Sequence, residues 1–493
     1  MVKILVVYTG GTIGSVHRPP TDLLSPLVPG TWDEISSLPI VRDALLELEN
    51  KDDLTVKADE FNPTLDSSNM SPKDWIDIAT KIQSHYNDYQ GFVVLHGTDT
   101  MTYTATALSF ILQNLTKPVI VTGSQLPISS VRTDAVQNFI TSLRIAAGEY
   151  MNPPLPLVPE VCIFFQNKLI RGNRSRKINA SGYDAFDSPN YPLLGEAGEY
   201  IEIRKEMMVP KPDGELSLKK SLEKNVMSFD IFPGIQSSDV MNRIMQTSDL
   251  KGLVLKTYGT GNAPTDENFL KAIEEGVKRG VVVVDVTQCL RGKVEIGLYE
   301  TSAGLLTRGV VSGADMTPEA ALCKLMLLLK MYEPSQAKDY VQQDLHGEQS
   351  ESIYNLDYGE GTADPEKRTK SIPITGILRT ENLTHAVIKA IDVTLDGPVG
   401  TQFRVSTFIN LTEDVPKNFE EQERMTEYCD YRDVTWTGKP VPFLPFEATG
   451  TARNMLARPS LPVSVTMYTD KFKMSWRNLS LTLIASVGKA SER

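Results

Sequence analysis

Three segments in the first quarter of the chain share one pattern, in which a short apolar run ends in glycine and a hydroxyl residue. The runs occupy residues 4–7, 92–95 and 119–121, and a polar turn follows each of them. Consecutive apolar residues, many of them β-branched, are typical of a strand that is buried on both faces of a parallel sheet. Enough residues separate the runs for crossover helices, so the pattern predicts a doubly wound α/β domain.

The first of these turns reads Tyr8-Thr9-Gly10-Gly11-Thr12-Ile13-Gly14. Its glycines let the backbone take positive φ angles and approach a ligand closely, and they leave the hydroxyl of Thr12 at the carboxyl end of the strand. A phosphate-binding loop is one interpretation, and a plain strand-to-helix turn is another. The glycine spacing fits neither of the common nucleotide-binding motifs, which disfavours a nucleotide site.

The other two turns carry further polar side chains. Right-handed crossovers place the carboxyl ends of parallel strands together, and that edge is where open α/β sheets bind ligands. We therefore expect four side chains to converge there, those of Thr12, Thr98, Asp99 and Ser124.

A threonine hydroxyl is a poor nucleophile unless a base lies nearby. Lys177 is a candidate base, because it follows the apolar run 161–165 and lies beside Arg174 and Arg176. The adjacent cations would lower the pKa of Lys177 and the carboxylate of Asp99 would raise it, so the two effects oppose each other. Two interpretations stay open on these residues, acyl transfer by a threonine and a sheet edge that only binds a small polar ligand.

The remainder of the chain divides into two further parts. Apolar runs at 253–255 and 281–286 again end in threonine turns and indicate a second, smaller α/β domain. After residue 371 apolar and polar residues alternate with period two, as in a β-sandwich. The expected organisation is an N-terminal α/β domain at 1–200, a linker at 201–225, a second α/β domain at 226–349, a linker at 350–371 and a β-sandwich-like domain at 372–493.

Composition excludes several classes of partner and site. A formal net charge of -12 disfavours nucleic acids and anionic membranes as partners, because both call for a basic surface. The 4 cysteines and 5 histidines lack metal-ligand spacing, so neither a zinc site nor a disulfide framework is expected. No apolar run approaches the roughly 20 residues that span a bilayer, and the N-terminus leaves no room for a signal peptide. These features predict a cytoplasmic protein.

Several segments resemble the signature segments of the bacterial-type L-asparaginases, in particular those of the cytoplasmic branch. The two signature segments of that family are matched by residues 8–14 and by His96-Gly97-Thr98-Asp99-Thr100-Met101. Further matches follow in the right order at 66–70, 121–125, 171–174, 258–264, 287–289 and 313–317. The resemblance runs from residue 2 to about residue 350 and implies a two-domain asparaginase-like α/β core.

The resemblance implies hydrolysis of L-asparagine to L-aspartate and ammonia through a covalent acyl-enzyme, with no metal and no cofactor. Thr12 matches the nucleophile of the family. Thr98, Asp99 and Lys177 match its second catalytic cluster, whose aspartate also holds the α-ammonium group of the substrate.

A further set of residues is expected to bind the substrate. A zwitterionic amino acid needs an anionic group for its ammonium and neutral donors for its carboxylate, and the matched positions supply both. This set consists of Asp66, Ser67, Ser68 and Ser124.

Two details follow from the same resemblance. Many bacterial members carry a tyrosine in the lid after the first threonine, whereas the lid loop expected here at 15–30 contains Thr21-Asp22-Leu23-Leu24-Ser25-Pro26 and no tyrosine. The group that activates Thr12 is therefore not predicted. A second, regulatory asparagine site of some cytoplasmic members is matched by Thr257, Thr287 and Cys289, for which ordinary strand-end residues are the alternative.

Other polar residues near the turns are expected to be structural. His96 precedes the Gly-Thr-Asp turn and is interpreted as a packed, hydrogen-bonded histidine rather than a catalytic base. Arg174 and Arg176 are interpreted as solvated or ion-paired. The family usually forms a homodimer or homotetramer, so a homo-oligomer is expected.

The C-terminal region matches no family signature. It is expected either to dock on the core and stabilise an oligomer or to bind a separate partner or lipid surface, for which the one hint is the group Lys471, Phe472, Lys473 and Trp476.

Two other functions are alternatives for the whole chain. The first is an amidohydrolase that feeds ammonia to a transamidating partner, as the asparaginase-like subunit of a glutaminyl-tRNA amidotransferase does. It is disfavoured because that subunit has an extra N-terminal domain, whereas this chain begins at the first strand. A non-catalytic amino-acid sensor is disfavoured because Thr12, Thr98, Asp99 and Lys177 are intact.

Overall fold

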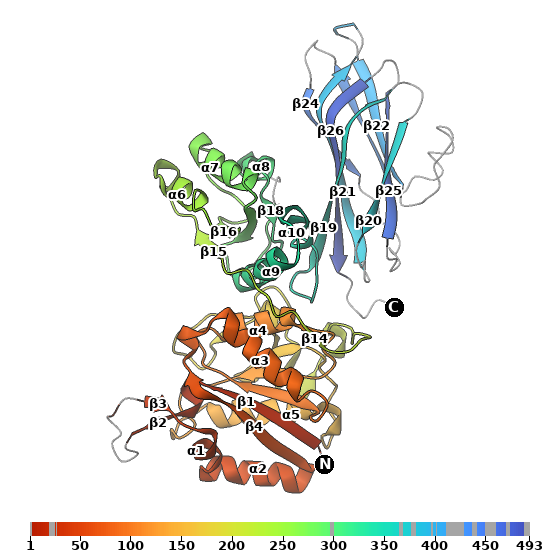
Figure 1. The fold of residues 1–493 in the computed structure, drawn as a ribbon. Helices are drawn as coiled ribbons and strands as arrows, with labels where there is room; N and C mark the ends of the chain where they lie inside the picture. The colour runs from red at the N-terminus through yellow and green to blue at the C-terminus, as the bar shows by residue number, and fades with distance from the viewer. Residues whose placement is uncertain are drawn as a thin grey trace. The chain divides into compact units, whose positions relative to one another are not determined.

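The computed structural model divides the chain into two compact units (Figure 1). The first takes in Met1–Val341 and Leu345–Gln349, and the second takes in Gln342–Asp344 and Ser350–Gly488. The residues that the structure describes are 2–18, 25, 27–295, 300–363, 368–375, 381–395, 398–400, 402–410, 428–435, 441–448, 460–469 and 474–487.

An eight-stranded sheet with the order β13-β12-β9-β8-β7-β5-β1-β4 organises the N-terminal part of the first unit. The three predicted runs form β1 (Val2–Gly10), β5 (Gly91–Leu95) and β7 (Val119–Thr122), which are parallel neighbours. The doubly wound, mostly parallel sheet predicted from the pattern is therefore confirmed. The other strands are β4 (Leu54–Leu65), β8 (Val161–Phe165), β9 (Lys168–Arg171), β12 (Gly195–Ala197) and β13 (Ile201–Ile203), of which the last three are antiparallel.

Helices cover both faces of this sheet, and successive residues of β1 therefore pack into two different cores. Leu5 packs in one core with α3 (Pro72–Ser84) and α4 (Met101–Ile111). Ile4 packs in the other core with α5 (Ala135–Ala147). Burial on both faces explains why the strands are continuous apolar runs instead of alternating ones.

The lid segment at 15–30, expected as a loop, contains a small hairpin. Its strands are β2 (Ser15–His17) and β3 (Leu27–Pro29), which pair antiparallel. Residues 19–24 and 26, most of the expected lid sequence, lie outside the described residues. After the hairpin come α1 (Trp32–Ser36) and α2 (Pro39–Asp52), separated because Pro39 has no N–H and fits the first position of a new helix.

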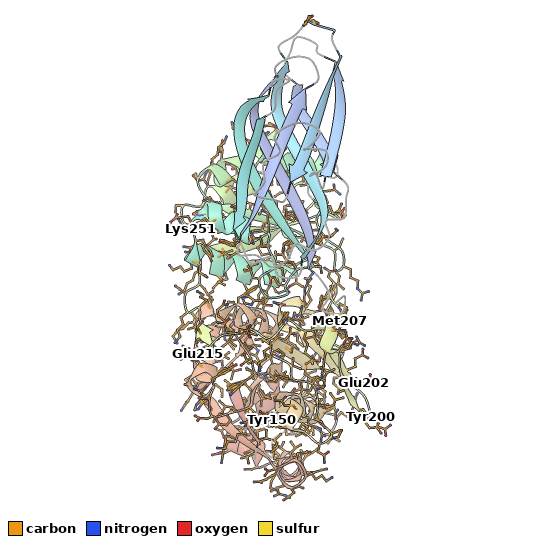
Figure 2. All side chains as sticks on the ribbon, turned by 90° about the vertical axis from the view of Figure 1, so that its right-hand side faces the viewer. Tyr150, Tyr200, Glu202, Met207, Glu215 and Lys251 are labelled. Atoms are coloured by element: carbon orange, nitrogen blue, oxygen red, sulfur yellow. The ribbon has the colours of Figure 1, made fainter. Side chains whose placement is uncertain are left out.

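Part of the expected linker at 201–225 belongs to the first domain. Its first residues form β13, the edge strand, and Ser217–Leu218 forms β14, which pairs with β6 (Leu112–Gln113). Figure 2 labels Tyr200 and Glu202 at this edge, where Tyr200 is 70% exposed. A short edge strand with a solvent-facing side carries no apolar run, so its sequence pattern is hard to tell from that of a linker.

A second, smaller sheet follows, in which β15 (Val226–Asp230), β16 (Gly252–Thr257), β17 (Val282–Thr287) and β18 (Val311–Ser312) are parallel and adjacent in that order. This confirms the second α/β domain. Its helices are α6 (Val240–Met245), α7 (Glu267–Lys278), α8 (Glu300–Thr307), α9 (Pro318–Met331) and α10 (Pro334–Tyr340). The side chain of Thr317 caps α9, and Leu327 of that helix packs in the same core as α4, which joins the two α/β domains.

The described residues of the second unit form two four-stranded antiparallel sheets, as expected for an all-β C-terminal domain (Figure 1). Their orders are β19-β26-β21-β24 and β20-β25-β22-β23. The strands are β19 (Glu351–Ala363), β20 (Arg368–Thr375), β21 (Glu381–Leu395), β22 (Gln402–Asn410), β23 (Tyr428–Thr435), β24 (Val441–Ala448), β25 (Ser460–Thr469) and β26 (Met474–Val487).

The expected linker at 350–371 is wrong, because most of it forms β19 and the start of β20. The glycines interpreted as flexible, Gly359 and Gly361, lie at register shifts between β19 and β26. A glycine within a strand often marks such an irregularity, which sequence alone does not distinguish from a linker. Residues 471–473, part of the hinted partner-binding group, lie outside the described residues.

Candidate active site

Three turns of the first domain pack closely, two of them backbone to backbone and the third through a serine side chain. Gly11 has a φ of 87°, and a Cβ there would lie 2.4 Å from the amide nitrogen of Gly97. A Cβ on Gly97 would in turn lie 2.4 Å from the hydroxyl oxygen of Ser67. Only glycine permits so close an approach, and it brings the turns that carry Thr12, Thr98 and Ser67 together.

Thr12 begins a 3₁₀ turn, Thr12–Gly14, directly after Gly11, and its side chain is partly exposed. The neighbouring Thr9 hydroxyl donates to the carbonyl of Leu95, 2.8 Å away, which ties the ends of β1 and β5 together. The buried Tyr8 hydroxyl donates to the carbonyl of Gly30, and burial raises the pKa of this phenol. Tyr8 therefore stays protonated and anchors the base of the lid hairpin.

Lys177, Thr98 and Asp99 form a compact hydrogen-bonded cluster. The side-chain nitrogen of Lys177 lies 2.9 Å from the Thr98 hydroxyl oxygen and 2.8 Å from Oδ1 of Asp99. Thr98 is buried at 7% exposure, whereas the Asp99 side chain is 64% exposed. The cluster thus has a buried hydroxyl at one end and an accessible carboxylate at the other, joined by one amine that can take or give a proton.

The turn that contains Asp66 presents an ionised carboxylate. Its Oδ1 accepts hydrogen bonds from the amide nitrogen of Ser68, 2.9 Å away, and from the Ser68 hydroxyl, 2.7 Å away. These two hydrogen bonds lower the pKa of Asp66. The Thr100 hydroxyl donates to the carbonyl of Ser67, 2.7 Å away, and so fixes this turn against the one that carries Thr98.

His96 is fully buried and its two ring nitrogens are both occupied. Nδ1 lies 2.6 Å from the carbonyl oxygen of Gly97, which can only accept, so this nitrogen carries the proton. Nε2 lies 2.9 Å from the Thr104 hydroxyl, which then donates to it. Burial lowers the pKa of His96 to about 4, so the imidazole is neutral near pH 7 and acts as a structural support for the turn, as expected.

Ser124 lies at the end of β7, in a turn that also reaches this place. A Cβ on Gly123 would lie 2.3 Å from the carbonyl oxygen of His96, so the two turns are in contact. The Ser124 hydroxyl itself donates to the carbonyl of Leu126, and Asp134 accepts from the amide nitrogens of Gln125 and Leu126. The serine is therefore held by its own loop and is almost fully buried.

The residues of the expected regulatory site lie at the ends of β16 and β17, in the second α/β domain. Thr257 and Thr287 are register partners at the ends of β16 and β17, and the Thr287 hydroxyl accepts from the amide nitrogen of Cys289. The Thr257 hydroxyl donates to Oδ1 of the buried Asp285, 2.7 Å away. Burial raises the pKa of Asp285 to about 8. Sequence reasoning missed Asp285, although a carboxylate within a run of valines was a signal for it.

Both arginines beside Lys177 are ion-paired, which was one of the two expectations for them. Arg174 pairs with Asp315 at 2.8 Å, and Arg176 lies 3.6 Å from Glu319. The carboxylates come from the start of α9 and the residues before it, a region matched to the family but given no role from sequence. Spacing along the chain gives no sign of this contact, because it joins segments 141 residues apart.

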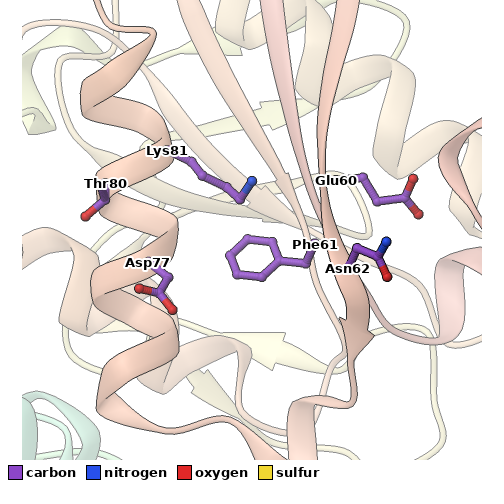
Figure 3. Close-up of a pocket in the computed structure, with 6 residues that line it drawn as sticks. All are labelled: Glu60, Phe61, Asn62, Asp77, Thr80 and Lys81. Carbon is purple, nitrogen blue, oxygen red and sulfur yellow. The ribbon is translucent and has the colours of Figure 1, made fainter.

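A surface hollow elsewhere on the first domain contains none of the predicted site residues. Figure 3 shows this hollow between β4 and α3, and its volume is about 480 Å³. The Lys81 nitrogen lies 5.0 Å from the centre of the Phe61 ring there. Its lining residues are Glu60, Phe61, Asn62, Asp77, Thr80 and Lys81.

The described residues contain neither a metal-binding cluster nor a helix that could span a membrane. Among them, no group of three histidine, cysteine, aspartate or glutamate side chains could hold a metal ion. No helix in the described part of the chain has the length and apolar character needed to cross a membrane.

Comparison with known proteins gives a consistent result over the first unit. The family model for the N-terminal asparaginase domain matches residues 3–209, and that for the glutaminase/asparaginase C-terminal domain matches residues 225–340. L-asparaginase 1 of Escherichia coli strain K12 is 43% identical over 347 residues, which cover 70% of this chain and 97% of that protein. The 60 kDa lysophospholipase of Homo sapiens is 38% identical over 368 residues, 70% of this chain and 61% of that protein.

A solved structure is similar over the same region. The crystal structure of L-asparaginase I from Vibrio cholerae aligns with a TM-score of 0.62 and 41% sequence identity. The alignment covers 71% of this chain and 99% of that one.

Proposed function

The chain belongs to the asparaginase family, and from that premise we propose that it hydrolyses L-asparagine to L-aspartate and ammonia with Thr12 as the nucleophile. The observation that carries this proposal is the cluster of Lys177, Thr98 and Asp99, in a turn that packs directly against the Thr12 turn. A hydroxyl nucleophile and a lysine–hydroxyl pair at one sheet edge supply what amide hydrolysis requires.

In the proposed reaction, Oγ of Thr12 attacks the side-chain amide carbon of asparagine. The Thr12 proton leaves through the Lys177 and Thr98 cluster and is returned to the departing nitrogen, so the C–N bond breaks and ammonia is released. The product of this first half is an ester between Thr12 and the β-carboxyl group of aspartate. Water then attacks the ester, and the Thr12 hydroxyl and L-aspartate are regenerated. Backbone N–H groups at the glycine turns stabilise the oxyanion of each step.

The substrate's two charged groups have matching partners. Asp66 is held as a carboxylate by Ser68, and the exposed end of Asp99 is a second anion for the α-ammonium group. Ser67 and Ser68 are the neutral groups assigned to the α-carboxylate side, and Ser124 is a further substrate-binding residue in this proposal. Because these groups recognise a zwitterion, simple amides without an α-amino acid are poor substrates in this proposal.

We also propose three features of the protein that go beyond the reaction itself. Thr257, Thr287 and Cys289 bind a second asparagine that raises activity, supported by the buried Asp285 beside them. The protein functions as a homodimer or homotetramer. Its working compartment is the cytoplasm, consistent with an asparaginase 1 relative and with the free thiols of Cys162, Cys289 and Cys323.

Ammonia release tests the proposed function. The rate is measured against concentration for L-asparagine and L-glutamine, with the wild-type chain, Thr12→Ala and a control, Thr80→Ala, on the exposed face of α3. We expect Thr12→Ala to lower kcat for asparagine by at least about 10³-fold and the control to match wild type. A fully active Thr12→Ala would contradict the nucleophile assignment. Wild-type protein that binds asparagine without releasing ammonia would support the sensor alternative instead.

The same curves test regulation. A sigmoidal dependence on asparagine that becomes hyperbolic in Thr287→Ala is the expected result. A hyperbolic curve for the wild type would contradict the second site.

A further inference from the structure

Two segments matched to the family have no role in the proposed reaction, and the structure joins them. They are 171–174, at the end of β9, and 313–317, before α9. Nη1 of Arg174 donates to Oδ2 of Asp315 at 2.8 Å, and both side chains are largely buried, at 1% and 11% exposure. A charge-assisted hydrogen bond in such surroundings is strong and directional.

Arg174 is fixed on other sides as well. Its Nε donates to the carbonyl oxygen of Gly347, 2.8 Å away, and its guanidinium carbon lies 5.0 Å from the centre of the Tyr191 ring. The guanidinium group is planar, so two hydrogen bonds along different edges and a ring against its face define its position completely. Arg174 is therefore a fixed point in the first domain that the second domain holds in place.

Only two residues separate Arg174 from Lys177, and both are restrained. Ser175 donates from its hydroxyl to the carbonyl of Gly172, 2.7 Å away, which closes the turn around Arg174. Arg176 and Lys177 form the short strand β10 (Arg176–Lys177), paired with β11 (Phe186–Asp187). Because these contacts restrain the backbone of the segment, a displacement of Arg174 also displaces the backbone of Lys177.

The contact of Arg176 with Glu319 is a second link between the segment that carries Lys177 and the start of α9. The two side chains approach to 3.6 Å, and Glu319 lies on the first turn of α9. Asp315 and Glu319, four residues apart, thus face the two arginines that flank Ser175. The start of α9 is in this way complementary in charge to the segment that carries Lys177.

We propose that Arg174 and Asp315 are positioning residues, which hold the amine of Lys177 against Thr98 so that the second α/β domain sets the geometry of the cluster in the first. The inference rests on the proposed function, in which Lys177 transfers protons. Proton transfer demands hydrogen-bond distance, and a shift of about 1 Å in such a group is enough to cost about 100-fold in rate. Apart from Asp99, the proposed substrate-binding residues lie on other turns, so they keep their places when this contact is weakened.

The test uses Asp315→Asn in the full chain, together with Asp315→Glu and a control, Asp59→Asn. Asp59 lies on β4 and pairs with Lys81 of α3, so the control removes an ion-paired carboxylate of the first domain outside the Lys177 cluster. For Asp315→Asn we expect kcat for asparagine to fall by about 10- to 100-fold while KM changes by less than about 2-fold. Asp315→Glu should regain part of the lost kcat, because it restores the charge opposite Arg174, and Asp59→Asn should leave both constants unchanged.

The outcomes separate this inference from the proposed function. If the wild-type chain releases no ammonia, the proposed function itself fails. If the wild type is active and Lys177→Met is not, but Asp315→Asn keeps the wild-type kcat, the positioning role is wrong. A rise in KM that matches the fall in kcat would also overturn it, since that pattern indicates a generally loosened site.

A second variant guards against a loss of folding. Circular dichroism and the unfolding midpoint are recorded for every variant. If Asp315→Asn does not fold, Arg174→Lys takes its place, because lysine keeps the charge opposite Asp315 but cannot also bind the Gly347 carbonyl in the same plane. The same selective fall in kcat is expected for it, and an unchanged kcat contradicts the inference.

Discussion

Lys177 lies within 2.9 Å of the Thr98 hydroxyl, although 79 residues of sequence separate them. The contact exists because the turn after β5, which carries Thr98, and the segment after β9, which carries Lys177, meet at one edge of the sheet. The Lys177 side chain donates to this hydroxyl and to the neighbouring Asp99 carboxylate, which compensates its charge.

Removing the amine is the first prediction. Lys177→Met should lower kcat for asparagine by about 10²- to 10⁴-fold, because the proton from Thr12 loses its acceptor. The matched control is Lys168→Met. Lys168 lies on β9, outside the cluster, and pairs with Asp184. Steady-state ammonia release measures both. Equal activity of the two variants would mean that Lys177 serves structure alone.

The second prediction concerns the close packing of the glycine turns. Gly11→Ala should destabilise the fold by about 2–4 kcal/mol, because its Cβ would overlap the Gly97 amide and its φ of 87° is strained for alanine. Gly198→Ala is the control, since no atom lies within 4 Å of a Cβ there. It should change stability by no more than about 0.5 kcal/mol. Chemical denaturation measures both, and a Gly11→Ala variant as stable as the control would show that the turns can move apart.

The third prediction is a dependence of stability on pH that comes from His96. Its pKa is lowered from 6.5 to about 4 in the folded protein, so the unfolded chain binds a proton more readily between these values. His96 therefore stabilises the fold fully above about pH 6.5, and this contribution of about 3 kcal/mol is lost as the pH falls toward 4. The advantage of wild type over His96→Gln should shrink accordingly. A constant difference across that range would mean that His96 is not neutral in the fold.

The architecture and the catalytic side chains follow from different kinds of information. Continuous apolar runs ending in glycine turns were enough to predict that β1, β5 and β7 are parallel strands of one sheet, because burial on both faces leaves a local trace. The rule that carboxyl ends of parallel strands meet at one sheet edge also predicted that Thr98 lies near the Thr12 turn. The partnership of Arg174 with Asp315 left no such trace, since each residue alone has the pattern of a solvated charge.

The β domain shows where local reasoning fails. Period-two alternation revealed the strands after residue 371, but β19 contains two glycines and several charges and was interpreted as a linker. Its strand state depends on pairing with β26, more than a hundred residues later in the chain. Pairing of that range is a tertiary effect, and intrinsic preference carries little information about it.

The last prediction concerns the ion pair that closes the first unit. Lys324 on α9 and Glu348 lie 2.6 Å apart and both are completely buried. Burial raises the pKa of Glu348, but the charge and hydrogen bond of Lys324, together with the charge and the amide nitrogen of His346, outweigh burial, so the pKa is lowered. Each charge thus compensates the desolvation cost of burying the other.

Breaking that pair from one side should therefore be worse than removing it. Lys324→Met alone leaves a buried carboxylate without its cation and should cost about 3–5 kcal/mol of unfolding free energy. Adding Glu348→Gln removes the stranded charge while keeping an oxygen for the two amides, so the double variant should recover about half of the loss or more. Denaturant unfolding of the two single variants and the double variant measures the coupling. Strictly additive losses would mean that the two residues stabilise the fold independently, in spite of their contact.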